Sequence, residues 1–333
     1  FNSRSRHTRS CILSRGLGDV YKRQPEITSL PDGMESPAPK IAAKGGGMAD
    51  VAALLVSSLA GRGADVHVAL PHYRRLFGVE PLEFDNEEWK DYKKKHANTS
   101  IHLAEDRSFY YRNRVYSYRN HKNPGIALAF QREVLNNILS RVCPDIIHCH
   151  DWMTGLVPAA ARRLNIPCLF TLHNIHTERV SLAHVESMGI DAAEFWQSLY
   201  LDRYPWNYEE SREHNPIDLL GSGLFASDFI NTVSPTFLDE IIGGRHGGIP
   251  DLLLEHLGGK RDAGEAAGIL NAPPPSYNPS IDSALVQTYD AESFVSGKAA
   301  KKIEFQKRSG LERNPHAPRD IWPTRRDPMQ KGG

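Results

Sequence analysis

Residues 145–172 read DIIHCHDWMTGLVPAAARRLNIPCLFTL and contain, in order, a strand, a helix and a second strand. The apolar runs Asp145–Cys149 and Pro167–Leu172 are the two predicted strands, and Gly155–Leu164 between them is the predicted helix. Strands that alternate with helices in this way predict a parallel sheet covered by helices.

The same alternation continues in both directions along the chain. Apolar residues at helical spacing predict a helix over Met48–Leu59, and Val66–Leu70 follows it as a buried strand. Later, strand Phe229–Val233 leads to a helix that opens with Ser234 as its N-cap and Pro235 at its first position. The predicted fold is therefore α/β, a Rossmann-like, doubly wound parallel sheet that binds ligands at the carboxyl ends of its strands. Further predicted elements are strand Ile27–Leu30 and helices Ile126–Arg141 and Gly297–Arg308.

The two ends of the chain differ from this middle part. Residues 1–24 are rich in Arg and Ser and show no helical or strand periodicity. They resemble translated sequencing adapter, or else a disordered tail, so they are left out of the fold prediction. From about Gly258 the sequence pattern differs from the strand–helix alternation before it. Pro273-Pro-Pro275 predicts a rigid loop ahead of the last helix.

Composition places the chain among ordinary globular proteins, with 40% apolar and 24% charged residues. Its 40 basic residues balance 40 acidic ones, so no overall field would attract nucleic acid or a membrane surface. The four cysteines lack metal-ligand spacing, and no apolar run reaches the ~20 residues of a membrane span. We therefore expect a cytoplasmic protein whose thiols are free.

A glycine-rich loop, Lys44-Gly-Gly-Gly-Met-Ala-Asp50-Val, precedes the first predicted helix. Glycines allow close approach of the backbone to a ligand, and the helix N-terminus offers free N–H groups to phosphate. Lys44 would add a positive charge suited to a pyrophosphate or a leaving phosphate. The spacing matches neither the dinucleotide fingerprint nor a P-loop, and a tight turn with Lys44 in solvent fits the pattern equally well.

The sequence His148-Cys-His150-Asp151 ends one predicted strand. Alternation along a strand places His148 and His150 on the same face, and such a pair can bind zinc, which makes a metal-dependent hydrolase an alternative. No clear set of further ligands follows in the sequence, and both histidines could equally be structural.

Polar residues also end the next strand, at Thr171-Leu-His-Asn-Ile-His176. Because sequential strands are usually neighbours, Asp151 and the pair His173–Asn174 are expected to line one crevice. Convergent polar groups suit hydroxyl-rich ligands, although a single histidine at such a place is more often structural.

Together these motifs resemble the family of bacterial glycogen synthases and plant starch synthases. The glycine loop resembles the family's Lys-x-Gly-Gly-Leu-(Gly/Ala)-Asp-Val signature, with Met48 in the position of Leu. Further matches in the same order are Ala64-Asp-Val-His-Val-Ala-Leu-Pro71, Pro144-Asp-Ile-Ile-His-Cys-His-Asp-Trp-Met-Thr-Gly-Leu156, Phe170-Thr-Leu-His-Asn174, Asn231-Thr-Val-Ser-Pro-Thr236, Gly268-Ile-Leu-Asn271 and Asp320 to Gly332.

The resemblance implies the amino-terminal, acceptor-side half of a GT-B glycosyltransferase, in which two Rossmann-like domains face each other. It assigns residues 25–315 to that half and 316–333 to the truncated start of the carboxyl-terminal, nucleotide-sugar-binding domain. The implied reaction is retaining transfer of glucose from ADP-glucose to an α-1,4-glucan. It requires no metal or other cofactor, and the fragment alone is expected to be inactive.

Site residues follow from the matched motifs. The resemblance implies catalytic roles for Lys44 and His173, the latter in contact with the transferred glucose. Arg325 and Lys331 match two cations that hold the phosphates, although Arg326 replaces an expected Leu there. The remaining implied substrate-binding residues are Gly46, Gly47, Asp50, His150, Asp151, Asn174 and Asn271.

Two other functions stay open beside the metal hydrolase. The chain could use UDP-glucose, because the pocket for the base lies in the domain expected to be missing. It could also be a glucan-binding module without catalysis.

Overall fold

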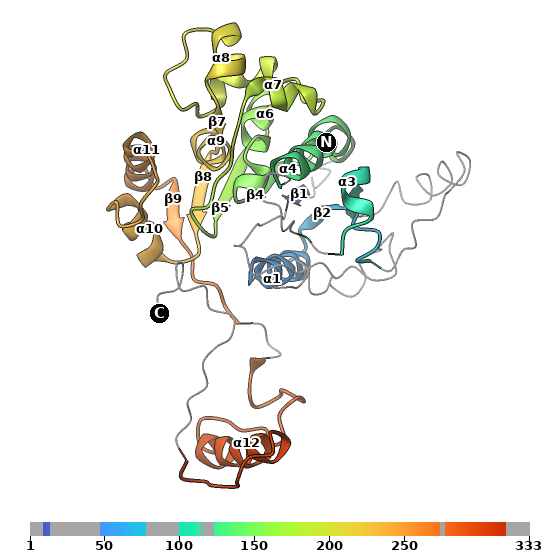
Figure 1. Cartoon of the computed structure of the whole chain (residues 1–333), viewed down its shortest axis with the longest axis vertical. Helices are drawn as coiled ribbons and strands as arrows, with labels where there is room; N and C mark the ends of the chain where they lie inside the picture. The colour runs from blue at the N-terminus through green and yellow to red at the C-terminus, as the bar shows by residue number, and fades with distance from the viewer. Residues whose placement is uncertain are drawn as a thin grey trace, which may run out of the picture. The chain divides into compact units, whose positions relative to one another are not determined.

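The computed structural model describes the backbone of residues 9–13 and, in full, residues 47–77, 100–113, 115, 123–273 and 277–317. The chain forms two compact units, Phe1–Asn271 and Ala272–Gly333 (Figure 1). This division differs from the predicted domain boundary after residue 315. The boundary between the units lies soon after the last strand of the sheet, just before the proline-rich sequence 273–275.

The first unit is built on a 7-stranded sheet with the order β3-β2-β1-β4-β5-β8-β9, in which every neighbouring pair is parallel. The strand order changes direction between β1 and β4, as in a doubly wound fold, so the predicted fold class is confirmed. The strands are β1 (Arg9–Leu13), β2 (Asp65–Pro71), β3 (Ile101–Ala104), β4 (Ile146–His150), β5 (Cys168–Leu172), β8 (Phe229–Thr232) and β9 (Ala266–Gly268).

Strand β1 lies inside the segment that the sequence analysis left out of the fold. It occupies the middle of the sheet, where Ser10 pairs with Val66 of β2 and with Ile146 of β4. Leaving residues 1–24 out of the fold prediction was therefore wrong for Arg9–Leu13. Only Cys11-Ile-Leu13 is apolar in this strand, a run too short to show periodicity on its own. The other predicted strand in this part of the chain, Ile27–Leu30, lies outside the described residues.

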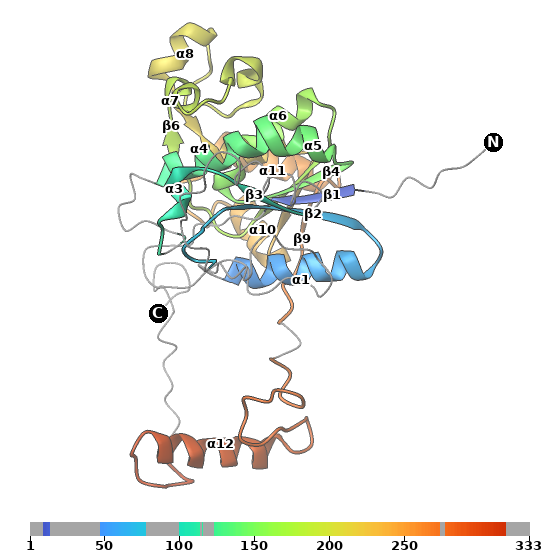
Figure 2. The same ribbon diagram turned by 90° about the vertical axis from the view of Figure 1, so that its right-hand side faces the viewer.

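Helices cover both faces of the sheet, with α1 on one side and α4, α5 and α6 on the other (Figure 2). This is the layered arrangement that buries both faces of a parallel sheet. The helices are α1 (Gly47–Gly61), α3 (Arg107–Tyr110), α4 (Asn123–Glu133), α5 (Leu139–Val142), α6 (Val157–Arg163), α7 (Leu182–Ser187), α8 (Tyr208–His214), α9 (Leu219–Ala226), α10 (Pro235–Ile242) and α11 (Asp251–Asp262). Short 3-10 turns are Trp152–Thr154, Ala192–Glu194 and Trp196–Ser198, and β6 (Arg179–Val180) pairs antiparallel with β7 (Ile217–Asp218).

Predicted helix bounds agree with the structure to within about three residues, except that one predicted helix is interrupted. Ser234 caps α10 as predicted, because its hydroxyl accepts a hydrogen bond from the backbone N–H of Phe237 at 3.0 Å. The single helix predicted over Ile126–Arg141 is instead α4 and α5 joined by a π turn, η2 (Val134–Ile138). Such turns insert a residue into an α-helix without changing its apolar spacing enough to be read from sequence.

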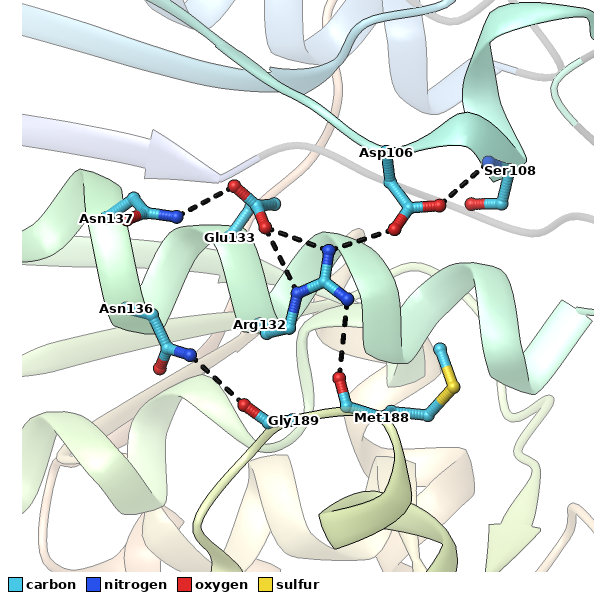
Figure 3. Close-up of polar contacts among 8 residues, drawn as sticks. All are labelled: Asp106, Ser108, Arg132, Glu133, Asn136, Asn137, Met188 and Gly189. Carbon is cyan, nitrogen blue, oxygen red and sulfur yellow. Dashed lines mark hydrogen bonds and ion pairs between the residues drawn. The ribbon is translucent and has the colours of Figure 1, made fainter.

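An arginine at the end of α4 ties three helices together (Figure 3). The Arg132 guanidinium donates to the carboxylates of Asp106, ahead of α3, and of Glu133, at 2.9 Å each. It also donates at 3.4 Å to the carbonyl of Met188, the C-cap of α7. Charge-assisted bonds of this kind fix geometry better than neutral ones. The cluster therefore positions α7 and the loops around it against α4.

The second unit contains one described helix, α12 (Phe294–Arg308), close to the predicted bounds Gly297–Arg308. The side chain of Gln306 donates to the carbonyl of Asn314 at 2.9 Å and accepts from its N–H at 3.0 Å. These bonds fold the segment after the helix back along it.

Candidate functional site

A row of polar side chains crosses three neighbouring strands. His148 on β4 pairs through Nε2 with the hydroxyl of Thr171 on β5 at 2.6 Å. That hydroxyl in turn bonds the side-chain oxygen of Asn231 on β8. All three side chains are buried. Buried polar groups cost free energy unless they are paired, and here each satisfies its neighbour across the sheet.

The row lies on a single face of the sheet. Phe170, between Leu169 and Thr171 on β5, points to the other face, where its ring touches Gly223 of α9. Because side chains alternate along a strand, Thr171 points away from α9. His148 and His150 share the face of Thr171, and their rings stack with centroids 4.3 Å apart, as the alternation predicted. The two faces of the sheet therefore differ, one apolar under α9 and one lined by histidines.

Asp151 joins the carboxyl ends of β4 and β5. Its carboxylate accepts from the backbone N–H of His173 at 2.8 Å and from the side-chain amide of Asn174 at 3.2 Å. The residue is fully buried and has φ 53° and ψ −179°. Residues other than glycine rarely adopt this backbone conformation, which costs about 1–3 kcal/mol. Such strained residues are concentrated at functional sites. The bonds of the carboxylate hold the strained turn in place.

Asp151 thereby holds His173 and Asn174 together at the carboxyl ends of β4 and β5. His173 is half-buried and its Nε2 lies 3.0 Å from Nδ1 of His150. The rings of His150 and His173 are 5.2 Å apart, so three histidines form a continuous stack from β4 to the loop after β5. The predicted convergence of Asp151 with His173–Asn174 is therefore present in the structure.

Burial keeps the three histidines neutral. It lowers the pKa of His148 to about 4. It lowers the pKa of His173 to about 3, with His148 adding repulsion. Burial, reinforced by the neighbouring rings, also holds the pKa of His150 well below its ordinary value. At neutral pH each ring therefore acts as an uncharged hydrogen-bonding group, one nitrogen donating and the other accepting.

The other predicted site residues are placed less completely. Gly47 and Asp50 lie in the first turn of α1, Gly47 exposed and Asp50 half-buried. Asn271 is exposed, after β9 and at the end of the first unit. Lys44, Gly46, Arg325 and Lys331 lie outside the described residues.

Three buried polar residues of this region were not predicted as site residues. Thr171 and Asn231 belong to the polar row, and Thr154 accepts at 3.0 Å from the backbone N–H of His150. The Thr154 hydroxyl donates in turn to the carbonyl of His150 at 2.9 Å. A threonine within an apolar strand was the available signal for Thr171, because a hydroxyl inside a sheet needs a partner.

Possible metal ligands and thiols can be located only within the described residues. Among the described residues no three His, Cys, Asp or Glu side chains lie close enough together to hold a metal ion. Cys149 and Cys168 face each other on β4 and β5 with their sulfurs 3.7 Å apart, a distance too long for a disulfide bond. None of the helices in the described part of the chain combines the length and the apolar character that crossing a membrane requires.

The chain was compared with protein families, curated proteins and solved structures. The sequence profile described as the starch synthase catalytic domain matches residues 36–256. The chain belongs to the starch synthase catalytic domain family. The match covers α1, the strands from β2 to β8 and the first half of α11, and so includes the histidine stack and Asp151.

Curated relatives of this family member are named glycogen synthases. The chain is 30% identical over 303 residues to the glycogen synthase of Exiguobacterium sibiricum, which covers 83% of the chain and 59% of the relative. It is 32% identical over 300 residues to the glycogen synthase of Hydrogenobaculum sp., covering 82% of the chain and 57% of the relative. The chain thus spans somewhat under three-fifths of the length of these relatives.

A solved structure supports the fold. The catalytic domain of starch synthase IV from Arabidopsis thaliana, bound to ADP and acarbose, superposes with a TM-score of 0.60 at 21% identity. The superposition covers 92% of this chain and 59% of the plant protein. The doubly wound sheet of the family member is therefore shared with a starch synthase catalytic domain.

Proposed function

We propose that the chain is the acceptor-side half of a glycogen or starch synthase, which transfers glucose from ADP-glucose to the non-reducing end of an α-1,4-glucan with retention. The observation that carries the proposal is the Asp151 turn, which holds His173 and Asn174 together at the carboxyl ends of β4 and β5. Ligands of doubly wound sheets bind at this edge. Membership of the family supplies the reaction class.

The neutral histidines fit this reaction. Transfer from a sugar nucleotide develops positive charge at the anomeric carbon, and a hydroxyl-rich sugar must be held by directional bonds. An uncharged His173 can bond a glucose hydroxyl without placing a cation beside that carbon. His150 Nδ1 meets Nε2 of His173 and fixes the orientation of its ring, so Nδ1 of His173 is the nitrogen left for the sugar.

The phosphates would be bound at the N-terminus of α1. Gly47 opens this helix, and free N–H groups at a helix N-terminus attract phosphate oxygens. Lys44 in the preceding loop, with Arg325 and Lys331 later in the chain, would stabilise the charge that grows on the departing phosphate. Gly46 would give the loop close backbone access, and Asn271 would lie near the same sugar.

The partner of this half would be the second domain of the synthase. The glycogen synthase relatives extend beyond the part that the chain matches. We propose that the 333 residues alone transfer no glucose, because most donor contacts and the closure that excludes water belong to the other half. No metal or other cofactor takes part in the proposed reaction, and the cytoplasm is the expected compartment.

An assay of glucose transfer tests this proposal. The chain is joined to the carboxyl-terminal half of the Exiguobacterium sibiricum relative, and incorporation of labelled glucose from ADP-glucose into glycogen is followed. His173→Gln should lower incorporation by about 100-fold, since one transition-state hydrogen bond contributes roughly 3 kcal/mol. His184→Gln, which changes an exposed histidine of α7, is the matched control and should leave the rate unchanged.

Other outcomes separate the alternatives. Glucose incorporation from UDP-glucose and not from ADP-glucose would show that the reaction is glucose transfer with a different donor. Glucan binding without turnover of either donor would favour the non-catalytic binding module and would overturn the proposal.

A further inference from the structure

Two aromatic side chains stand almost completely in solvent on the loop ahead of α8. Tyr204 is 98% exposed and Trp206 is 89% exposed, the two largest values among the exposed large hydrophobic residues described. Burial of such rings contributes strongly to folding, so proteins rarely leave two of them out together without a use.

The loop that carries the rings is held firmly at both ends. Asn215 bridges to Arg203, donating to its carbonyl at 2.8 Å and accepting from its N–H at 3.0 Å. On the other side, Asn207 caps α8 through the backbone N–H of Glu210 at 2.9 Å. Pro205 between the aromatic residues fixes its own φ and restricts Tyr204. A loop fixed in this way would lose little conformational freedom when a ligand binds to it.

Neighbouring aromatic residues of the same segment are packed in the ordinary way. The rings of Trp196 and Tyr208 lie 5.6 Å apart, and the hydroxyl of Tyr208 bonds Glu186. The segment therefore packs these two aromatic rings, both partly buried, against the rest of the unit. The exposure of Tyr204 and Trp206 is a separate feature of the loop and not a sign of poor packing.

Charged side chains in ion pairs surround the loop. Arg203 pairs with Glu210 at 3.3 Å, and Arg212 pairs with Glu186 at 2.6 Å and with Glu213 at 2.9 Å. These pairs hold three carboxylates and two guanidinium groups, and their negative excess does not favour an anionic partner. A ligand that offers C–H faces to the rings and hydroxyls to these charged groups would complement the loop.

We propose that Tyr204 and Trp206 form a surface binding site for a linear α-1,4-glucan, separate from the site at β4 and β5. The flat C–H faces of glucose rings would stack on the aromatic rings, and the glucan hydroxyls would bond the polar rim. Figures 1 and 2 both place α8 on the side of the first unit away from α1. The polar row faces away from α9, which packs on α6, and so points to the α1 side of the sheet. The aromatic loop would therefore anchor the polymer at a distance from the reacting end. This inference rests on the proposed function for the identity of the glucan.

The test uses the full 333-residue chain with maltoheptaose and glycogen as probes. Binding is followed by co-sedimentation with glycogen and by protection of tryptophan fluorescence from acrylamide quenching. The double variant Tyr204→Ala/Trp206→Ala should lower glycogen affinity by about tenfold or more, as expected for two stacking contacts. Tyr111→Ala, which removes a ring that is 58% exposed elsewhere, is the matched control and should bind as the native chain does.

Maltoheptaose should protect Trp206 from quenching in the native chain, and the protection should be absent in Trp206→Ala. Unchanged affinity in the double variant overturns the inference, as does a native chain that binds no glucan. A change of oligomeric state in the double variant with unchanged glucan affinity also overturns it, in favour of a contact between copies.

The two proposals can fail separately. If His173→Gln abolishes transfer while the double variant binds glucan normally, the proposed function stands and the surface site does not. If the double variant loses glucan affinity while the joined enzyme transfers no glucose, the surface site stands and the proposed function does not.

Discussion

Asp151 is the residue on which the geometry of the site depends most. Its two carboxylate oxygens accept from His173 and Asn174 in a backbone conformation that is otherwise unfavourable. In Asp151→Asn, an NH2 group replaces one carboxylate oxygen and cannot accept a hydrogen bond, so a buried donor loses its partner. We expect the free energy of unfolding to fall by about 1–3 kcal/mol, measured by urea denaturation.

The control for this substitution is Asp191→Asn, at an exposed position with no role in the turn. It should unfold within about 0.5 kcal/mol of the native chain. Equal stability of Asp151→Asn and Asp191→Asn would show that the turn does not depend on the carboxylate.

The buried histidines predict a pH dependence. In the unfolded chain a histidine has a pKa near 6.5, whereas His148 titrates at about 4 and His173 at about 3 in the fold. Between pH 6.5 and 4 the unfolded chain therefore binds more protons, and stability decreases as the pH falls. Each such histidine contributes a slope of about 1.4 kcal/mol per pH unit. His102, whose pKa burial lowers to about 4, acts with the same sign.

Urea denaturation at pH 7.5 and pH 5.0 measures this slope. His148→Gln should reduce the loss between the two values, and His184→Gln, at an exposed position, should not. A chain equally stable at both pH values would contradict the buried, neutral state of the stack.

The site residues differ in how far the sequence could identify them. His150, Asp151, His173 and Asn174 end predicted strands, so their convergence followed from parallel strand order. The partners of His148 did not follow. Thr171 and Asn231 meet only because β5 and β8 are neighbours in a register that no local pattern specifies.

At the scale of the elements, Arg132 should be a major contributor to the packing of α4. Arg132→Met removes the cation between Asp106 and Glu133 and leaves both partly buried carboxylates without it. We expect a loss of about 1–3 kcal/mol in the free energy of unfolding, measured in urea. Arg132→Lys should recover part of the loss, because lysine keeps the charge but not the fork of donors.

Arg62→Met is the matched control, since Arg62 is exposed just beyond α1. If Arg132→Met and Arg62→Met unfold at the same urea concentration, the cluster in Figure 3 does not hold the helices together.

Gly155 lies where the turn after β4 meets α9. A Cβ added there would collide with the backbone carbonyl of Leu219, the first residue of α9. Because backbone cannot rotate away as a side chain does, Gly155→Ala should destabilise the fold by about 3 kcal/mol or more. Thermal unfolding measures the effect, with Gly247→Ala, which meets nothing within 4 Å, as the control. A melting temperature shared by the two variants would show that α9 can shift.

The elements that the sequence predicted are those with strong local signals. Caps and apolar spacing located α1, α10 and the strands β2, β4, β5 and β8, because these signals act within a few residues. The π turn in α4–α5 and strand β1 were not predicted. Both depend on packing against distant parts of the chain, β1 because it forms only between β2 and β4.

At the scale of the whole molecule, the central claim is that this chain is half of a glucan synthase. The family and the fold are established by the profile match and by the doubly wound sheet. The donor, the acceptor and the role of the glycine loop remain the proposals that an activity measurement must decide. The chain spans less than two-thirds of its relatives, so the measurement needs the complementary half.

The most direct measurement compares glucose incorporation into glycogen from ADP-glucose by the chain alone, by the joined two-domain protein, and by the joined protein with Lys44→Ala. The account predicts no transfer by the chain alone, transfer by the joined protein, and a loss of about 100-fold or more when the lysine is removed. Transfer by the chain alone, or an unchanged rate in Lys44→Ala, would contradict it.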